Sequence, residues 1–267
     1  MEKTKNMEIM IMNFSGIYRE EHFYERIKTT WAEVQGIPGT NCYCDDEAAE
    51  MLRDKIREFP VKGIHFIDSG NYHYMSRIWL EKMNRPFRLL VFDNHTDMQL
   101  PAFGGILSCG GWIAAALEEL PLLKEVLLCG PDEEAFCQVP EELKGRVRFL
   151  SREKLKAGQM EAGQPDAGRK RGVQDFFAEI PADMPVYLSI DKDVLCPEDA
   201  CTAWSQGDMR RRELLEYLEI VLEKLESMGQ QLAGVDICGE CSPDEGNSDV
   251  NDVSNRALLE FFRNRKG

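Results

Sequence analysis

Residues 87–97 read Phe-Arg-Leu-Leu-Val-Phe-Asp-Asn-His-Thr-Asp, an apolar run followed at once by three potential metal ligands at alternate positions. Short apolar runs rich in Leu and Val are typical of strands that are buried on both faces of a parallel sheet. Similar runs recur along the chain and alternate with longer stretches of helical periodicity. This alternation predicts an α/β fold with a parallel sheet covered by helices on both faces.

Eight strands are expected from these runs, at 8–13, 41–44, 63–68, 87–92, 125–129, 146–150, 186–190 and 231–237. Amphipathic helices are expected at 45–59, 211–227 and 254–265, where apolar residues recur three or four positions apart. Residues 153–172 are poor in apolar side chains and predict an exposed excursion. Residues 241–252 predict an acidic loop after the last strand.

The charge balance excludes one class of partner. The chain has 267 residues, with 32 Lys and Arg against 47 Asp and Glu, a net charge of −15, and its basic runs are only three residues long. A nucleic-acid-binding protein needs a basic face, so no nucleic-acid partner is expected. No apolar stretch approaches the ~20 residues of a membrane span, and no signal-peptide pattern opens the sequence. We therefore expect no membrane association and a cytoplasmic location.

Nine cysteines are scattered over the chain. An odd number in a protein of this size favours reduced, mostly structural thiols over a secreted disulfide framework. Cys238 and Cys241 have thioredoxin-like C-x-x-C spacing, but no second pair completes a four-cysteine zinc site. A redox protein built on this pair is one alternative interpretation.

The candidate site residues follow the predicted strands, because ligands of open parallel sheets bind beyond the carboxyl ends of the strands. Side chains at alternate positions of an extended backbone point to the same side. Crowded carboxylates repel one another unless cations neutralise them, and four Asp balance two divalent ions. The sequence therefore predicts a metal centre made of His73, Asp93, His95, Asp97, Asp191 and Asp193. The two other histidines, His22 and His65, lack such settings, and surface or core roles are expected for them.

Three sequence blocks resemble the arginase, agmatinase and formimidoylglutamase superfamily of binuclear manganese ureohydrolases. Residues 93–97 resemble its Asp-Ala-His-x-Asp signature, residues 189–193 its Ser-x-Asp-x-Asp, and residues 70–73 a degenerate Gly-Gly-Asp-His. The resemblance extends from about residue 63 to the C-terminus. It implies one three-layer α/β/α domain over residues 1–267, with a mostly parallel eight-stranded sheet, and a possible homo-oligomer.

By the same resemblance, two Mn²⁺ ions, or zinc or iron, would share a hydroxide that attacks a C–N bond of a guanidino, amidino or formimino compound. Asp97 and Asp191 are the candidates for hydrogen-bonding or bridging roles beside that hydroxide. A small cationic or amidine-type substrate is expected, with contacts from Glu240, Asn71 and Trp204. For Glu240 solvent exposure is the alternative, and for Trp204 a place in the core.

Two departures from the family pattern bear on catalysis. Cys109 stands where relatives usually have a histidine that serves in proton transfer or substrate binding, so it is a candidate acid/base group or a packing residue. Residues 200–205, with Trp204, replace a loop of small residues. The related deacetylases use tandem histidines, which this chain lacks. A metal-binding relative without hydrolase activity, structural or regulatory, is the remaining alternative.

Overall fold

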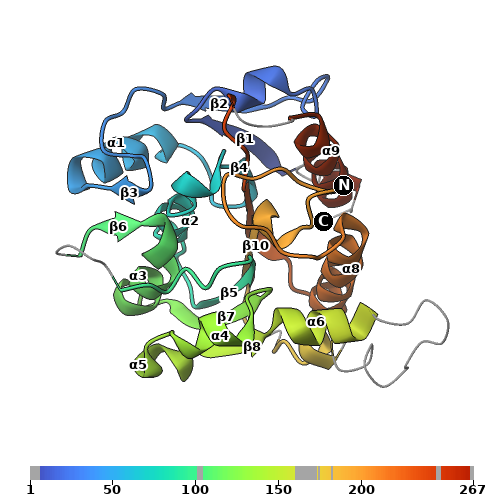
Figure 1. Ribbon diagram of the computed structural model, residues 1–267. Helices are drawn as coiled ribbons and strands as arrows, with labels where there is room; N and C mark the ends of the chain where they lie inside the picture. Colours follow the sequence, from blue (N-terminus) through green and yellow to red (C-terminus); the bar gives the residue numbers. More distant parts are fainter. Residues whose placement is uncertain are drawn as a thin grey trace.

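The computed structural model describes residues 7–100, 105–159, 173, 175–181, 183–244 and 248–264. Its centre is an eight-stranded sheet in the order β2-β1-β4-β10-β9-β5-β7-β8, in which all neighbouring strands are parallel (Figure 1). The strands are β1 (Glu8–Asn13), β2 (Thr30–Glu33), β4 (Gly63–Phe66), β5 (Phe87–Phe92), β7 (Leu123–Cys129), β8 (Val147–Leu150), β9 (Val186–Asp191) and β10 (Leu232–Cys238). Two short strands, β3 (Tyr43–Cys44) and β6 (Leu107–Ser108), form a separate antiparallel pair.

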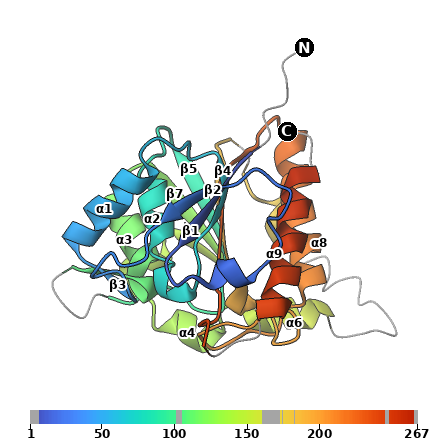
Figure 2. The same ribbon diagram turned by 90° about the horizontal axis from the view of Figure 1, so that it is seen from above.

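Helices cover both faces of the sheet. Figure 2 shows α1 (Asp46–Ile56), α2 (Met75–Leu80) and α3 (Trp112–Glu119) on one side and α8 (Arg211–Ser227) and α9 (Ser248–Asn264) on the other. The described residues also form the helices α4 (Glu133–Cys137), α5 (Glu141–Lys144) and α6 (Arg152–Gln159) and the 3₁₀ helices η1 (Ile17–Glu20), η2 (Gly70–Tyr72), η3 (Cys109–Gly111) and η4 (Lys192–Val194). The predicted three-layer α/β/α architecture is confirmed.

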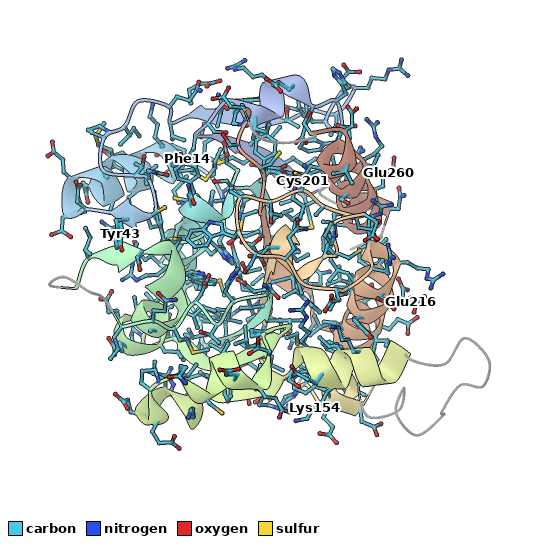
Figure 3. The ribbon with its side chains drawn as sticks, in the orientation of Figure 1. Phe14, Tyr43, Lys154, Cys201, Glu216 and Glu260 are labelled. Carbon is cyan, nitrogen blue, oxygen red and sulfur yellow. The ribbon has the colours of Figure 1, made fainter. Side chains whose placement is uncertain are left out.

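The alternation of side chains along β5 shows how the core is divided. Leu90 and Phe92 pack in the cluster that includes Leu214 of α8, whereas Leu89 and Val91 pack in the cluster on the α1–α3 side. Both clusters are apolar because a central parallel strand has no solvent-facing side. The outer helix surfaces are polar, as Glu216 on α8 and Glu260 on α9 illustrate (Figure 3).

One predicted strand of the sheet was wrong. Residues 41–44 do not join the large sheet, because only Tyr43–Cys44 is extended and it pairs with Leu107–Ser108. The eighth strand is instead β2, which pairs with β1 at the edge. The sequence prediction missed β2 because an edge strand buries only part of its surface, and Thr30 and Glu33 are exposed. The other seven predicted strands lie in the sheet.

The helix prediction at 211–227 was accurate, the one at 45–59 extended beyond α1 at both ends, and the one at 254–265 began too late. Helix α9 begins at Ser248, so the acidic-loop prediction was wrong for its last five residues. The buried stripe of α9 includes polar Asn251 and Asn255, which obscured its periodicity.

The predicted excursion begins with α6, which is anchored by buried Leu155. At the start of this helix, Ser151 Oγ accepts a 3.3 Å hydrogen bond from the N–H of Lys154. Residues 160–172 lie outside the described residues. None of the helices in the described ranges has the length and apolar character that a bilayer crossing requires.

Candidate metal centre

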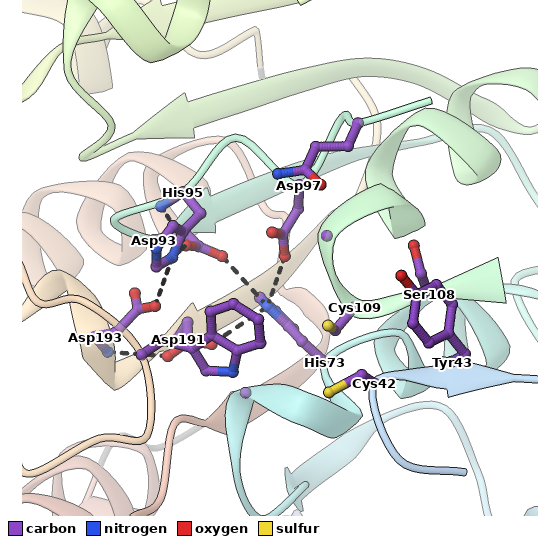
Figure 4. A pocket seen from close by; sticks show the side chains of 14 residues that line it. Cys42, Tyr43, His73, Asp93, His95, Asp97, Ser108, Cys109, Asp191 and Asp193 are labelled. Carbon is purple, nitrogen blue, oxygen red and sulfur yellow. Dashed lines mark hydrogen bonds and ion pairs between the residues drawn. The ribbon is translucent and has the colours of Figure 1, made fainter. Parts of the chain in front are cut away.

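The carboxyl ends of four neighbouring strands, β4, β10, β9 and β5, meet at the middle of the sheet. His73 follows β4 at the end of η2. Asp93, with His95 and Asp97 after it, follows β5, and Asp191 and Asp193 lie at the end of β9 and in η4. The structure thus brings together all six predicted metal residues from three strand ends (Figure 4).

Three carboxylates surround one nitrogen of His73. Its Nδ1 lies 3.0 Å from Oδ2 of Asp97, 3.3 Å from Oδ2 of Asp93 and 3.4 Å from Oδ2 of Asp191. The other ring nitrogen, Nε2, is 2.9 Å from Oγ of Ser189, which fixes the orientation of the ring. Nδ1 therefore faces the carboxylates as the ligand atom of a metal site would.

A second group forms around His95. Its Nδ1 lies 2.8 Å from Oδ2 of Asp193 and 3.5 Å from Oδ1 of Asp93, and its Nε2 is 2.9 Å from Oγ of Ser205. Asp93 thus turns one oxygen toward each histidine. This arrangement places Asp93 between two adjacent donor groups, as a carboxylate shared by two ions would be.

Burial and crowding change the protonation of both groups. Burial, and then the charge of Asp93, raise the pKa of Asp97 to about 6, and burial with neighbouring Asp191 raises the pKa of Asp193 well above its usual range. Burial alone would lower the histidine pKa values, but neighbouring acidic groups raise that of His95 to about 11 and that of His73 well above 6.5. The protonated imidazoles thus supply the positive charge beside these carboxylates that bound cations would otherwise supply.

The donor set fits two divalent cations. Oδ2 of Asp93 is buried and makes no well-aligned hydrogen bond, although His73 Nδ1 lies 3.3 Å away. A buried carboxylate oxygen without a partner is costly, and a cation at this point would remove that cost. One ion would have His73, Asp93 and Asp97 as donors, with Asp191 3.4 Å from the same imidazole nitrogen, and the other would have Asp93, His95 and Asp193. Imidazole with several carboxylates suits manganese, zinc or iron.

Two glycines let the backbone pass close to two of these aspartates. Gly239, directly after β10, has a φ of +92°, and a Cβ there would lie 2.3 Å from Oδ1 of Asp191. Gly130, after β7, has a φ of +126°, and a Cβ there would lie 2.1 Å from the carbonyl oxygen of Asp93. Any larger residue would displace the ligands, so both positions require glycine.

The six residues line one side of a pocket of about 140 Å³. The rest of its wall, within the described residues, carries no ionisable acid or base apart from thiol and phenol groups: Cys42, Tyr43, Gly70, Gln99, Ser108, Cys109, Gly110 and Trp204. This volume is below the 300–1,000 Å³ typical of drug-sized ligands. The pocket therefore suits a small molecule.

Comparison with known proteins identifies relatives of this chain. The model of the arginase family matches residues 44–262. The chain belongs to the arginase family. An uncharacterised protein of Thermotoga maritima is 30% identical over 253 residues, which cover 88% of this chain and 80% of that protein.

Solved structures of low sequence identity show the same fold. Arginase from Bacillus subtilis superposes with a TM-score of 0.67 at 17% identity, over 98% of this chain and 99% of that one. Formimidoylglutamase from the same organism gives 0.68 at 14% identity, over 98% and 88%. Agmatine ureohydrolase of Thermoplasma volcanium gives 0.64 at 16% identity, over 99% and 92%. The arginase-family fold thus extends over nearly the whole chain.

Cys109, which stands where arginase-family relatives were expected to have histidine, lines the pocket. Burial, and then the charge of Asp97, raise the pKa of its thiol to about 12. Its N–H donates a 2.9 Å hydrogen bond to the carbonyl of Cys42, whose side chain also lines the pocket. A thiol with this pKa remains protonated near neutral pH, so it is poorly suited to act as a base.

Trp204 and Asn71 occupy connected positions at the pocket rim. Trp204 lines the pocket and is 42% exposed, so its alternative assignment to the core was wrong. Its Nε1–H donates a 2.8 Å hydrogen bond to Oδ1 of Asn71, and Nδ2 of Asn71 donates at 2.9 Å to Oδ1 of Asn41. Asn71 therefore orients the indole, and it is not itself among the residues that line the pocket.

The expected substrate contact by Glu240 was wrong. The Glu240 side chain is completely buried, outside the pocket wall, and pairs with the ammonium of Lys192, which is also completely buried. Its Oε2 accepts a 2.6 Å hydrogen bond from Asn251, and its Oε1 accepts one of 2.8 Å from Asn255. Each carboxylate oxygen is thus used inside the protein, and solvent exposure, the alternative for Glu240, is also excluded.

Three contacts of the centre were missed from the sequence. Trp112 Nε1 donates a 2.6 Å hydrogen bond to Asp97, and Ser205 supports His95. The thiol of Cys238 donates to Oδ2 of Asp191 at 3.1 Å, and Cys241 lies instead beside Cys201. The two thiols of the C-x-x-C sequence therefore contact different neighbours. The sequence did offer a signal for Cys238, because this residue directly follows the predicted strand 231–237, at the end where ligands of parallel sheets bind.

Proposed function

We propose that this member of the arginase family hydrolyses a C–N bond of a small guanidino, amidino or formimino compound with the help of two divalent metal ions. The observation that carries the proposal is the position of Asp93, whose two oxygens face the His73 group and the His95 group respectively. Two ions bound there would lower the pKa of a water molecule and polarise the carbon that it attacks.

The side chains of this protein supply orientation and proton handling. Asp97, whose Oδ2 lies 3.0 Å from Nδ1 of His73, is the residue proposed to accept a hydrogen bond from the attacking water molecule. The indole of Trp112 fixes Oδ2 of this carboxyl, and Ser189 and Ser205 hold the two imidazoles. Positioned acid/base groups of this kind typically contribute about 10²- to 10⁴-fold to a rate.

The pocket wall favours a substrate without a charged tail. Beyond the six metal residues, the hydrogen-bonding groups of the described wall include the amide of Gln99 and the hydroxyl of Ser108, both uncharged. Glu240, the acid expected to attract a cationic group, is neutralised by Lys192. Compounds of the size of guanidine, methylguanidine or formamidine match the cavity of about 140 Å³ better than amino-acid derivatives do.

The test is an assay of ammonia, urea and formamide release by metal-loaded protein from guanidine, methylguanidine, formamidine, agmatine, arginine and formiminoglutamate. Release from at least one small compound, lost in Asp93→Asn, is the expected result. If protein that holds two ions releases nothing from any compound, the chain is a metal-binding relative without hydrolase activity.

A further inference from the structure

Cys238 lies against the metal centre on the side of His73. It is the last residue of β10 and is paired in register with Asp191, the last residue of β9. Residues paired across parallel strands point to the same face of the sheet, so both side chains point toward His73. The Cys238 side chain is buried, and its Sγ lies 3.1 Å from Oδ2 of Asp191.

The atoms of this group have the spacing of donors that share one ion. The imidazole of His73, a carboxylate oxygen of Asp191 and the sulfur of Cys238 all lie within 4.8 Å of one another. Bonds of about 2.0–2.3 Å to one ion separate neighbouring donors by roughly 3 to 3.6 Å. The measured separations, 3.1 Å for sulfur to Asp191 and 3.4 Å for His73 to Asp191, fall in this range.

A second observation points to a ligand beside the same histidine. Oδ2 of Asp93, which faces His73, is buried and without a well-aligned hydrogen-bond partner. An ion that removes this deficit would lie beside His73, whose imidazole also belongs to the group of Asp191 and Cys238. The group around His95 contains Asp93 and Asp193 and no sulfur. The two halves of the centre are therefore chemically unequal.

We propose that Cys238 is a thiolate ligand of the ion held by His73, and that it makes this position prefer a thiophilic divalent metal such as Zn²⁺ over Mn²⁺. Thiolate favours zinc, whereas carboxylate-rich sites suit manganese. On binding, the ion replaces the thiol hydrogen, which leaves to solvent as a proton, and no electron is transferred. The inference rests on the binuclear centre of the proposed function and is independent of hydrolysis.

The experiment loads the 267-residue protein with Co²⁺ and records its near-ultraviolet spectrum, where thiolate-to-cobalt charge transfer absorbs. The band is expected in the wild type and in two matched variants, Cys109→Ser in the pocket and Cys241→Ser beside Cys201. It is expected to disappear in Cys238→Ser. When Zn²⁺ and Mn²⁺ compete for the protein, Cys238→Ser should lower the preference for Zn²⁺ by about tenfold or more. Even residues that only hydrogen-bond to a metal ligand change metal affinity by this amount.

A measurement on the wild type keeps the test valid if Cys238→Ser does not fold. X-ray absorption of the zinc-loaded protein should show sulfur at about 2.3 Å from zinc. Protein that binds two Co²⁺ without the band, or that keeps the band in folded Cys238→Ser, overturns the inference and leaves the binuclear centre intact. Protein that binds no Co²⁺, Zn²⁺ or Mn²⁺ overturns both.

Discussion

The indole N–H of Trp112 donates a 2.6 Å hydrogen bond to Oδ2 of Asp97, and the same ring packs against the imidazole of His73 with centroids 4.8 Å apart. One side chain at the start of α3 thus holds two proposed metal residues from two different strand ends. Partners of this kind set the orientation and basicity of ligands.

Trp112→Phe should weaken metal binding. The change keeps an aromatic ring but removes the hydrogen bond to Asp97, so affinity should fall by about 10- to 100-fold, as measured by metal titration. Trp79→Phe is the matched control, because Trp79 is equally buried and its Nε1 has no hydrogen-bond partner among the described residues. Equal losses in both variants would show that packing, and not the hydrogen bond, supports the site.

Glu240→Gln should destabilise the fold without changing substrate affinity. The variant leaves the buried ammonium of Lys192 without its counter-charge, which typically costs about 3–5 kcal/mol of unfolding free energy. Lys192→Met combined with Glu240→Gln removes both charges and should recover most of this loss in urea unfolding. A stable Glu240→Gln protein with a KM raised more than about tenfold would restore Glu240 as a substrate contact.

Stability should fall with rising pH through Glu21. Burial, and then the charge of Glu240, raise the pKa of Glu21 from 4.5 to about 10. Between these values the folded state holds a proton that the unfolded state has lost. The stabilisation that the protonated Glu21 provides is therefore fully present below pH 4.5 and decreases toward pH 10. The decrease is at most about 1.4 kcal/mol per pH unit.

Glu21→Gln has no such proton, so its unfolding free energy should fall less between about pH 6 and about pH 9 than that of the wild type. Urea unfolding of metal-saturated protein at both pH values measures the difference. Glu20→Gln, at the exposed neighbouring position, should behave like the wild type. Identical pH slopes for the wild type and Glu21→Gln would contradict the assignment.

Cys109→Ser should retain most of the hydrolytic activity. Because the pKa of this thiol is raised to about 12 by burial and then by Asp97, it is not expected to act as an acid/base group near neutral pH. The value of kcat should stay within about tenfold of the wild type, whereas loss of an acid/base group costs about 10²- to 10⁴-fold. A loss in the latter range would make Cys109 catalytic.

The fold and the clustering of the six proposed metal residues could be predicted from strand-end reasoning. In a parallel sheet all carboxyl ends lie at one edge, so Asp93 after β5 and Asp191 at the end of β9 must approach each other once the strands are adjacent. The search for apolar runs did not find β2, because an edge strand such as residues 30–33 lacks a continuous apolar run.

The contacts that surround the centre depend on tertiary neighbours and left weaker signals. Trp112 lies 15 residues after Asp97, and its indole was indistinguishable from a core residue. The pairing of Lys192 with Glu240 joins residues 48 positions apart, and Lys192 stands between two ligands in the sequence, where an exposed lysine would look the same. Burial of both charges, visible only in the structure, changed the role assigned to Glu240.

Metal content tests the central claim most directly. Because Asp93 offers one oxygen to each half of the centre, the purified wild type should bind two ions per chain, and Asp93→Asn should lose both. Asp208→Asn, which alters a partly exposed carboxylate paired with Arg152, should still bind two. One ion or fewer in the wild type, or two ions in Asp93→Asn, would contradict a binuclear centre at this site.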